Sequence, residues 1–227
     1  MYEKYKEIFA DREDAAQRLK DVLPMQKVKE ESWKFIAVSK GGLVLASHVL
    51  GKLPNRLDFL FSEPIYAPNH NECEVARVSE SEEIVIHENL VASFDIKYDY
   101  IYGEARRKHE EKILSYIYQY RKGRHFSSIR NKVVVLIDEG SETGSKFLTG
   151  LKTILAQQPK AIYVVAPILP TDVLETLETF CDEVFFLYDI DDYVETSLYY
   201  KNFEKVSEDQ VEKLLESKKT EKKTDEV

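Results

Sequence analysis

The chain has 227 residues, 43% of them hydrophobic, which is enough for a sizeable core in one domain or a small pair of domains. Its 32 basic and 41 acidic residues give a net charge of −9, which argues against a broad nucleic-acid surface and against docking to an anionic membrane. No apolar run approaches the roughly 20 residues of a membrane span, and the first residues lack the apolar core of a signal peptide. Two cysteines cannot build a disulfide framework. We expect a soluble cytoplasmic protein.

The first part of the chain predicts a βαβ unit. Apolar residues at helical spacing indicate an opening helix over Ile8 to Leu23. The apolar segment Trp33 to Val38 predicts a strand, residues 39–42 a turn, Leu43 to Leu53 a buried helix, and Leu57 to Phe61 a second strand. This order of elements is typical of a parallel sheet.

The middle of the chain is less regular. Pro64 to Asn71 is expected to be a polar loop, and Glu83 to His87 an edge strand. Asp95 to Arg121 is expected to be a long, charged, tyrosine-rich helix that covers the domain with one face. We assign residues 62–125 mainly to a small hood on the core.

A second βαβ unit begins at Val133 to Ile137, a fully apolar strand of the kind that parallel sheets bury. After the turn Asp138 to Lys146, the expected elements are a helix (Phe147 to Ala156), a strand (Ala161 to Ala166), a helix (Pro170 to Phe180) and a strand (Val184 to Leu187). The charged segment 217–227 is predicted to be a disordered tail, so the domain spans residues 1–216.

The turn Asp138 to Lys146 is the first candidate site, because ligands of open parallel sheets bind beyond the carboxyl ends of the strands. Its two carboxylates, Asp138 and Glu139, suit ribose hydroxyls or a Mg²⁺ ion. The residues that follow can present backbone N–H groups and a helix N-terminus to a phosphate: Gly140, Ser141, Glu142, Thr143, Gly144, Ser145 and Lys146. An ordinary polar turn with helix caps is an equally open interpretation. A nucleotide-triphosphatase loop is excluded, because Gly140 and Gly144 are one residue too close together.

The second candidate is the turn Ser39, Lys40, Gly41 and Gly42. Paired glycines let the backbone approach a ligand closely, and Lys40 adds positive charge beside a helix start. A Gly-Gly turn alone is weak evidence. Two such turns after two parallel strands are stronger evidence than either alone.

These two segments resemble motifs of the type I phosphoribosyltransferases. Val133 to Lys146 is similar to the phosphoribosyl-pyrophosphate motif of that family, and Val38 to Gly42 is similar to its pyrophosphate loop. One bacterial branch of the family also has segments similar to Phe9 to Leu19, Ile65 to Glu72 and Phe203 to Val211. The resemblance therefore covers nearly the whole chain except the tail.

The resemblance implies an α/β fold, with a parallel-sheet core, helices on both faces and a small helical/β hood. It also implies a Mg²⁺-dependent transfer of the phosphoribosyl group of phosphoribosyl pyrophosphate to a nucleobase or related acceptor. Asp138 and Glu139 would contact the ribose hydroxyls directly or through Mg²⁺. Residues 140–146 would surround the 5′-phosphate, and residues 39–42 would meet the pyrophosphate.

Several residues depart from the family pattern near the phosphates: Glu139 replaces an Asp, Glu142 lies inside the phosphate loop, Lys146 replaces a Ser or Thr, Lys40 replaces an Arg, and Glu63 lies where a basic residue is expected. A carboxylate near a phosphate dianion weakens binding unless it points away or meets a cation. These departures favour an alternative function, a non-catalytic relative that binds a nucleotide or sugar phosphate as a sensor or interaction module. An RNA-binding regulator is disfavoured by the net charge.

The remaining candidates have ordinary structural interpretations. The five histidines lack metal-ligand spacing, so we expect His48 in the core and the others on the surface: His70, His87, His109 and His125. Arg121 or Arg124 could fold over the pyrophosphate, and Asp189, Asp191 or Asp192 could recognise the base, although an acidic loop is favoured. Tyr193 to Tyr200 could line a base pocket or a homodimer contact, although core packing is favoured. The sequence identifies neither the acceptor nor a general acid or base.

Overall fold

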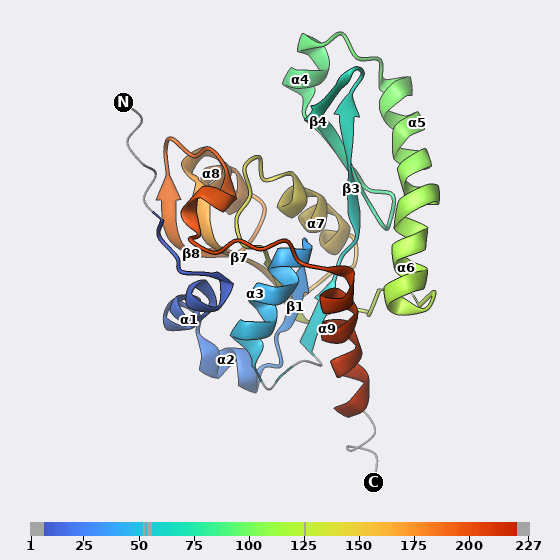
Figure 1. The fold of residues 1–227 in the computed structure, drawn as a ribbon. Coiled ribbons are helices and arrows are strands. Elements are labelled where there is room, and N and C mark those ends of the chain that lie inside the picture. Colours follow the sequence, from blue (N-terminus) through green and yellow to red (C-terminus); the bar gives the residue numbers. More distant parts are fainter. Residues whose placement is uncertain (1–6, 52, 54–55, 125, 222–227) are drawn as a thin grey trace.

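The computed structural model describes residues 7–51, 53, 56–124 and 126–221. Its core is a five-stranded parallel sheet in the order β2-β1-β6-β7-β8 (Figure 1). The strands are β1 (Lys34–Ala37), β2 (Leu57–Phe59), β6 (Val133–Ile137), β7 (Ala161–Pro170) and β8 (Glu183–Ile190). Each predicted core strand is present, and the predicted fold class is confirmed.

Helices cover both faces of this sheet because its central strand is apolar on both sides. Val133, Val135 and Ile137 of β6 join one hydrophobic cluster with α1 (Arg12–Val22) and α3 (Lys40–Leu50). Val134 and Leu136 point the other way, into a second cluster with α7 (Ser145–Leu155) and α8 (Thr171–Glu178). Alternate side chains of a strand face opposite sides of a sheet, so one apolar run supplies both clusters.

The hood follows β2 and contains a second sheet. Its three antiparallel strands are β3 (Ser62–Ala67), β4 (His70–Ser79) and β5 (Ile84–Ile86). Its helices are α4 (Glu88–Ser93), α5 (Tyr98–Lys108) and α6 (Leu114–Arg121), the last two joined by a π-helical turn, His109–Ile113. Figure 1 shows α5 and α6 as a nearly continuous rod beside β3 and β4. The predicted long helix and the predicted edge strand are thus confirmed.

The polar loop predicted for Pro64 to Asn71 is wrong. Those residues form most of β3, the turn after it and the start of β4. Ile65 and Ala67 are buried while Pro64 and Tyr66 are only partly so, which is the alternation of a half-buried strand. Asn69 turns the chain with a positive φ of 63°, a conformation that Asn tolerates better than most residues. Pro64 and the asparagines therefore belong to a β-hairpin, not to a loop.

The hood packs against the core at α7 and at the end of β2. Thr153 of α7 donates a hydrogen bond to Ser79 of β4 over 2.8 Å between the two hydroxyl oxygens. At the other end, Arg121 forms a buried ion pair with Glu80 and lies 4.8 Å from the centre of the Phe61 ring. The hood is therefore packed against the core at both ends.

Helix boundaries differ from prediction where capping groups decide them. The opening helix begins at Arg12 instead of Ile8, because the Asp11 side chain caps it by accepting from the Asp14 N–H over 2.9 Å. Phe9 instead forms a β-bridge with Tyr200. The described residues also form α2 (Met25–Glu30), a 3-10 helical turn (Thr196–Tyr199) and α9 (Glu208–Glu221).

The helix α9 packs on α3 and reaches into the segment for which disorder was predicted. Residues 222–227 of that segment lie outside the described residues. Within the part of the chain that the structure describes, no helix combines the length and the apolar character needed to cross a bilayer.

Candidate functional site

Two helices begin side by side at the carboxyl edge of the parallel sheet. Strands β1 and β6 are neighbours, and their last residues, Ala37 and Ile137, are paired in register. Helix α3 follows β1 after Ser39, and α7 follows β6 after the loop 138–144. Residues 39–42 are therefore not an open turn as predicted. Ser39 caps α3 by accepting from the Gly42 N–H over 2.9 Å, so the glycines form the first turn of that helix.

The two segments approach closely at Gly41 and Gly42, where a Cβ atom on Gly42 would lie 2.7 Å from the backbone carbonyl oxygen of Ile137. A Cβ atom on Gly41 would lie 1.9 Å from Glu139 Oε2, far inside van der Waals contact. The absence of a side chain thus allows the first turn of α3 to rest on the acidic end of β6. The two candidate turns, separated by about a hundred residues in sequence, form one continuous site.

Asp138 is fully buried at the centre of this site, with an exposed fraction of 0%. Its Oδ1 accepts hydrogen bonds from the Ser39 hydroxyl and, over 2.9 Å, from the Glu139 N–H. Its Oδ2 lies 2.7 Å from the Lys146 ammonium nitrogen. In this arrangement Asp138 has no surface with which to contact a ribose.

Glu139 is also paired inside the protein. Its carboxylate forms an ion pair with Arg12 of α1, and 13% of its side-chain area is exposed. Burial raises the pKa of Glu139, and the neighbouring Asp138 charge raises it further, while Arg12 acts in the opposite direction. The Glu139 backbone carbonyl accepts from the Tyr200 hydroxyl over 2.8 Å. Glu139 thus links α1, β6 and the segment after β8.

Glu142 does not point at the space where a phosphate is expected. Its Oε1 accepts from the Thr196 N–H over 3.0 Å and from the Thr196 hydroxyl over 2.7 Å. Burial acts to raise the pKa of Glu142, but these bonds outweigh it and the pKa is lowered. The anionic form of Glu142 is therefore stabilised by Thr196, which reduces the repulsion of a phosphate that was anticipated from the sequence.

Residues Tyr193 to Tyr200 hold Glu142 and cover the back of the loop. The Tyr193 hydroxyl lies 2.8 Å from that of Thr196, and Tyr199 and Tyr200 are buried. This segment therefore packs on the loop, in agreement with the core packing that the sequence favoured. Of the aspartates before it, Asp191 accepts a bond over 2.8 Å from the hydroxyl of Thr171, the first residue of α8.

A histidine of the hood reaches the loop between β6 and α7, although the sequence suggested only a surface residue. His87 Nε2 lies 2.6 Å from the Ser145 hydroxyl, which in turn lies 2.8 Å from the Thr143 hydroxyl. Thr143 is exposed and Ser145 is buried at the start of α7. The row of polar groups connects the hood to the loop. His125 lies outside the described residues.

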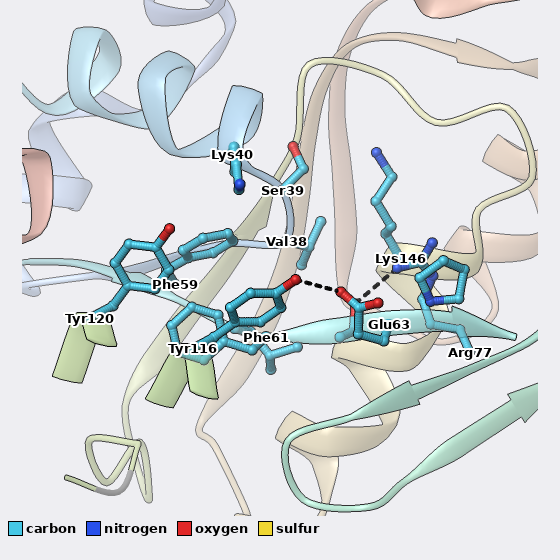
Figure 2. A pocket seen from close by; sticks show the side chains of 13 residues that line it. Val38, Ser39, Lys40, Phe59, Phe61, Glu63, Arg77, Tyr116, Tyr120 and Lys146 are labelled. Carbon is cyan, nitrogen blue, oxygen red and sulfur yellow. Dashed lines mark hydrogen bonds between the residues drawn. The ribbon is translucent and has the colours of Figure 1, made fainter. Parts of the chain in front are cut away.

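A cavity of about 230 Å³ opens in front of this edge, between the core and the hood (Figure 2). Phe59, Phe61, Tyr116 and Tyr120 form its aromatic side. Polar groups line the other side: Ser39, Lys40, Ser62, Glu63, Arg77 and Lys146. In Figure 2 the Tyr116 hydroxyl points at Glu63, to which it donates over 3.2 Å. The cavity therefore joins an aromatic surface to the cationic residues beside the two loops.

Glu63 lies on the cavity wall, at a position where the sequence resemblance led us to expect a basic residue. Its carboxylate is held by the Tyr116 hydroxyl and, at 3.8 Å, by the Lys108 ammonium group of α5. Burial raises the pKa of Tyr116 to about 12, with the Glu63 charge adding to the effect. Glu63 thus connects the hood strand to the hood helices.

The expected Mg²⁺ ion does not fit the arrangement of the two acids. Each carboxylate already has a cation of the chain as its partner, Lys146 for Asp138 and Arg12 for Glu139. Within the described residues, no group of three or more His, Cys, Asp or Glu side chains is arranged to hold a metal ion. Metal binding by these acids would require one of the two ion pairs to open.

Comparison with known proteins extends the resemblance over most of the chain. No family model matches it. It is 23% identical over 212 residues to proteins from two strains of Mycobacterium tuberculosis, each named "Putative phosphoribosyl transferase". The match covers 92% of this chain and 46% of each relative, so the chain spans about half the length of these curated relatives.

A solved structure agrees with the fold. The crystal structure of TT1426 from Thermus thermophilus superposes with a TM-score of 0.72 and 26% sequence identity, covering 91% of this chain and 97% of that one. In its parallel core, its two loops and its named relatives, the chain is similar to the type I phosphoribosyltransferases. The resemblance noted in the sequence is thereby confirmed.

Proposed function

We propose that the chain binds phosphoribosyl pyrophosphate across the N-termini of α3 and α7 and transfers its phosphoribosyl group to a nucleobase or related acceptor. The observation that carries the proposal is the convergence of two helix N-termini at the ends of adjacent parallel strands, beside one cavity. A helix N-terminus presents unpaired N–H groups and partial positive charge, which suit phosphate oxygens. Two of them side by side suit a ligand with phosphates at both ends of a ribose.

The side chains around the loops support an anionic ligand. Thr143 offers an exposed hydroxyl at the entrance of α7, and Glu142 is held away by Thr196. Lys40 and Lys146 line the cavity on its polar side. The 5′-phosphate would bind to loop 140–146, and the pyrophosphate would bind near residues 39–42.

The reaction we propose is a displacement at ribose C1. A nitrogen of the acceptor forms a bond to C1, the bond from C1 to the pyrophosphate oxygen breaks, and the acceptor N–H proton is released. Positioning of the two reactants and stabilisation of charge on the departing pyrophosphate are the contributions that such a site can make. Lys40 and Lys146 are the cavity cations placed to act on that charge.

A second candidate, ligand binding without transfer, is favoured by one observation. Asp138 is fully buried and Glu139 is paired with Arg12, so neither acid is presented to a ribose in this arrangement. A protein that recognises a nucleotide or sugar phosphate as a sensor needs the phosphate loop but not the acids. The two candidates differ in whether pyrophosphate is released.

Calorimetric titration of phosphoribosyl pyrophosphate, followed by an assay of pyrophosphate release with a panel of nucleobases, tests both candidates. Thr143→Asp should abolish binding, because it places a carboxylate at the phosphate loop on an exposed residue. Thr179→Asp, on the exposed end of α8, is the matched control and should bind normally. Binding with base-dependent pyrophosphate release supports the transferase, and binding without release with every base supports the sensor. Absence of phosphoribosyl pyrophosphate binding by the folded wild type refutes the transferase, and titration of nucleoside monophosphates then tests the sensor.

A further inference from the structure

Lys146 occupies an unusual position between a buried acid and an open cavity. It stands in the first turn of α7, and its ammonium nitrogen lies 2.7 Å from Asp138 Oδ2. Asp138 is wholly inaccessible, whereas 24% of the Lys146 side chain is exposed and lines the cavity beside Ser39 and Lys40. The Lys146 side chain thus lies between a fixed anion and the cavity.

The ion pair of Lys146 and Asp138 places a positive charge beside a buried negative one. Removal of one partner from a buried ion pair destabilises a fold by several kcal/mol, because the other charge is then left uncompensated inside the protein. Lys146 is paired with Asp138 through this contact of 2.7 Å, and an ammonium group has three N–H donors with which it can also meet a ligand.

A metal ion and the lysine cannot share this place. Mg²⁺ binds carboxylate oxygens at about 2.0–2.1 Å and would have to approach Asp138 Oδ2 from the side that Lys146 occupies. The other acid, Glu139, is held by Arg12. The other described cations on the cavity wall have acidic partners outside the two loops, Lys40 with Glu208 of α9 and Arg77 with Glu74 of β4. Lys146 is thus the cavity cation whose partner lies at the carboxyl end of β6 itself.

We propose that Lys146 takes the position of a divalent cation in this site, so that the chain binds phosphorylated ribose ligands without a metal. The ammonium group bridges the Asp138 carboxylate and a phosphate oxygen of the ligand. The inference rests on the proposed function, because it concerns the same phosphate site. It predicts a different dependence on metal for the wild type and for a variant without the lysine.

The test is a calorimetric titration of phosphoribosyl pyrophosphate in excess EDTA and in excess MgCl₂, with ligand-into-buffer blanks for each. The wild type should bind equally, within about twofold, in the two solutions. Lys146→Ser should lose about tenfold or more in EDTA, which is the size expected for one charge-assisted hydrogen bond, and should recover in MgCl₂ because Asp138 is then free to take the metal. Lys152→Ser, an exposed lysine on the same helix, should behave as the wild type.

Each other outcome has a definite meaning. A wild type that binds only in MgCl₂, or a Lys146→Ser variant that binds normally in EDTA, overturns the inference while leaving the proposed function intact. Loss of binding by Lys146→Ser in both solutions overturns the exchange of lysine for metal. No binding by the wild type in either solution refutes the proposed function instead.

A second variant covers the case in which Lys146→Ser fails to fold, as circular dichroism would show. The double substitution Asp138→Asn with Lys146→Ser leaves no buried charge at this position. It should bind weakly in EDTA and should not recover in MgCl₂, because the carboxylate that takes the metal is absent. Wild-type affinity of the double variant in EDTA would refute the role of Lys146.

Discussion

Gly41→Ala places a methyl group 1.9 Å from Glu139 Oε2, so one of the two must move. The flexible member is the Glu139 side chain, but moving it breaks its ion pair with Arg12, in which both side chains are nearly buried. Hydrogen bonds to charged groups contribute about 1.5–3 kcal/mol. A helical Gly→Ala change gains at most about 1 kcal/mol in return. We expect the free energy of unfolding to fall by about 1–2 kcal/mol.

Urea denaturation of four proteins measures this effect as a double-mutant cycle: the wild type, Gly41→Ala, Glu139→Ala and the double variant. In the Glu139→Ala background the methyl group has no carboxylate to meet, so Gly41→Ala should be neutral or stabilising. The coupling free energy between the two sites should therefore exceed about 1 kcal/mol. Gly103→Ala on α5, where a Cβ meets nothing within 4 Å, is the control and should stabilise. Equal effects of Gly41→Ala in both backgrounds would refute the close contact that joins the two loops.

Three further measurements test separate parts of the structure. Burial raises the pKa of Glu80 above its ordinary value of 4.5, so the native state keeps the Glu80 proton at a pH where the unfolded state has lost it, and the free energy of unfolding should fall as pH rises above 4.5. In urea denaturation at several pH values, Glu80→Gln should make the free energy of unfolding depend less on pH. The same pH dependence in the wild type and the variant would contradict the raised pKa. His87→Ala should weaken the binding of phosphoribosyl pyrophosphate by about three- to tenfold, because the Ser145 hydroxyl loses its hydrogen-bond partner. An unchanged affinity in calorimetry would show that the contact between His87 and Ser145 does not affect the ligand. Ultraviolet absorbance is measured against pH for the wild type and for Tyr116→Phe, and the difference should show one phenol that ionises near pH 12, because burial and the Glu63 charge disfavour the phenolate. Ionisation near pH 10 would instead show that Tyr116 is exposed to water.

The core and the position of the site were predictable because they depend on local patterns. A run such as Val133 to Ile137 is apolar throughout, so it indicates a strand buried on both faces. The polar and small residues after it mark the carboxyl edge of the sheet. The same reasoning applied to Ser39 predicts a turn, although a serine before a helix start is also an N-cap signal that would have identified the first turn of α3.

The partners of the site residues were not predictable in the same way. Arg12 and Glu139 are separated by 127 positions, and His87 and Ser145 by 58. No spacing rule relates residues on different elements at such distances, because their contact depends on how the elements pack. The hairpin at Pro64 to Asn71 was missed for a different reason: its turn-forming residues are conspicuous, whereas its strand pattern of partly buried residues is weak.

The two ends of the hood meet at one place on the core. The rings of Phe61, where the chain enters, and Tyr120, where it leaves, are stacked with their centres 5.7 Å apart. An insertion whose ends are already adjacent adds little closure entropy to the fold that carries it. The hood is thus suited to grafting: the parallel core could exchange it for a short linker, or for another insert, without changing the strands that present the two loops. Such an exchange would replace Tyr116, Tyr120 and the contact of His87 with Ser145, while Phe59, Phe61 and the loops after β1 and β6 would remain.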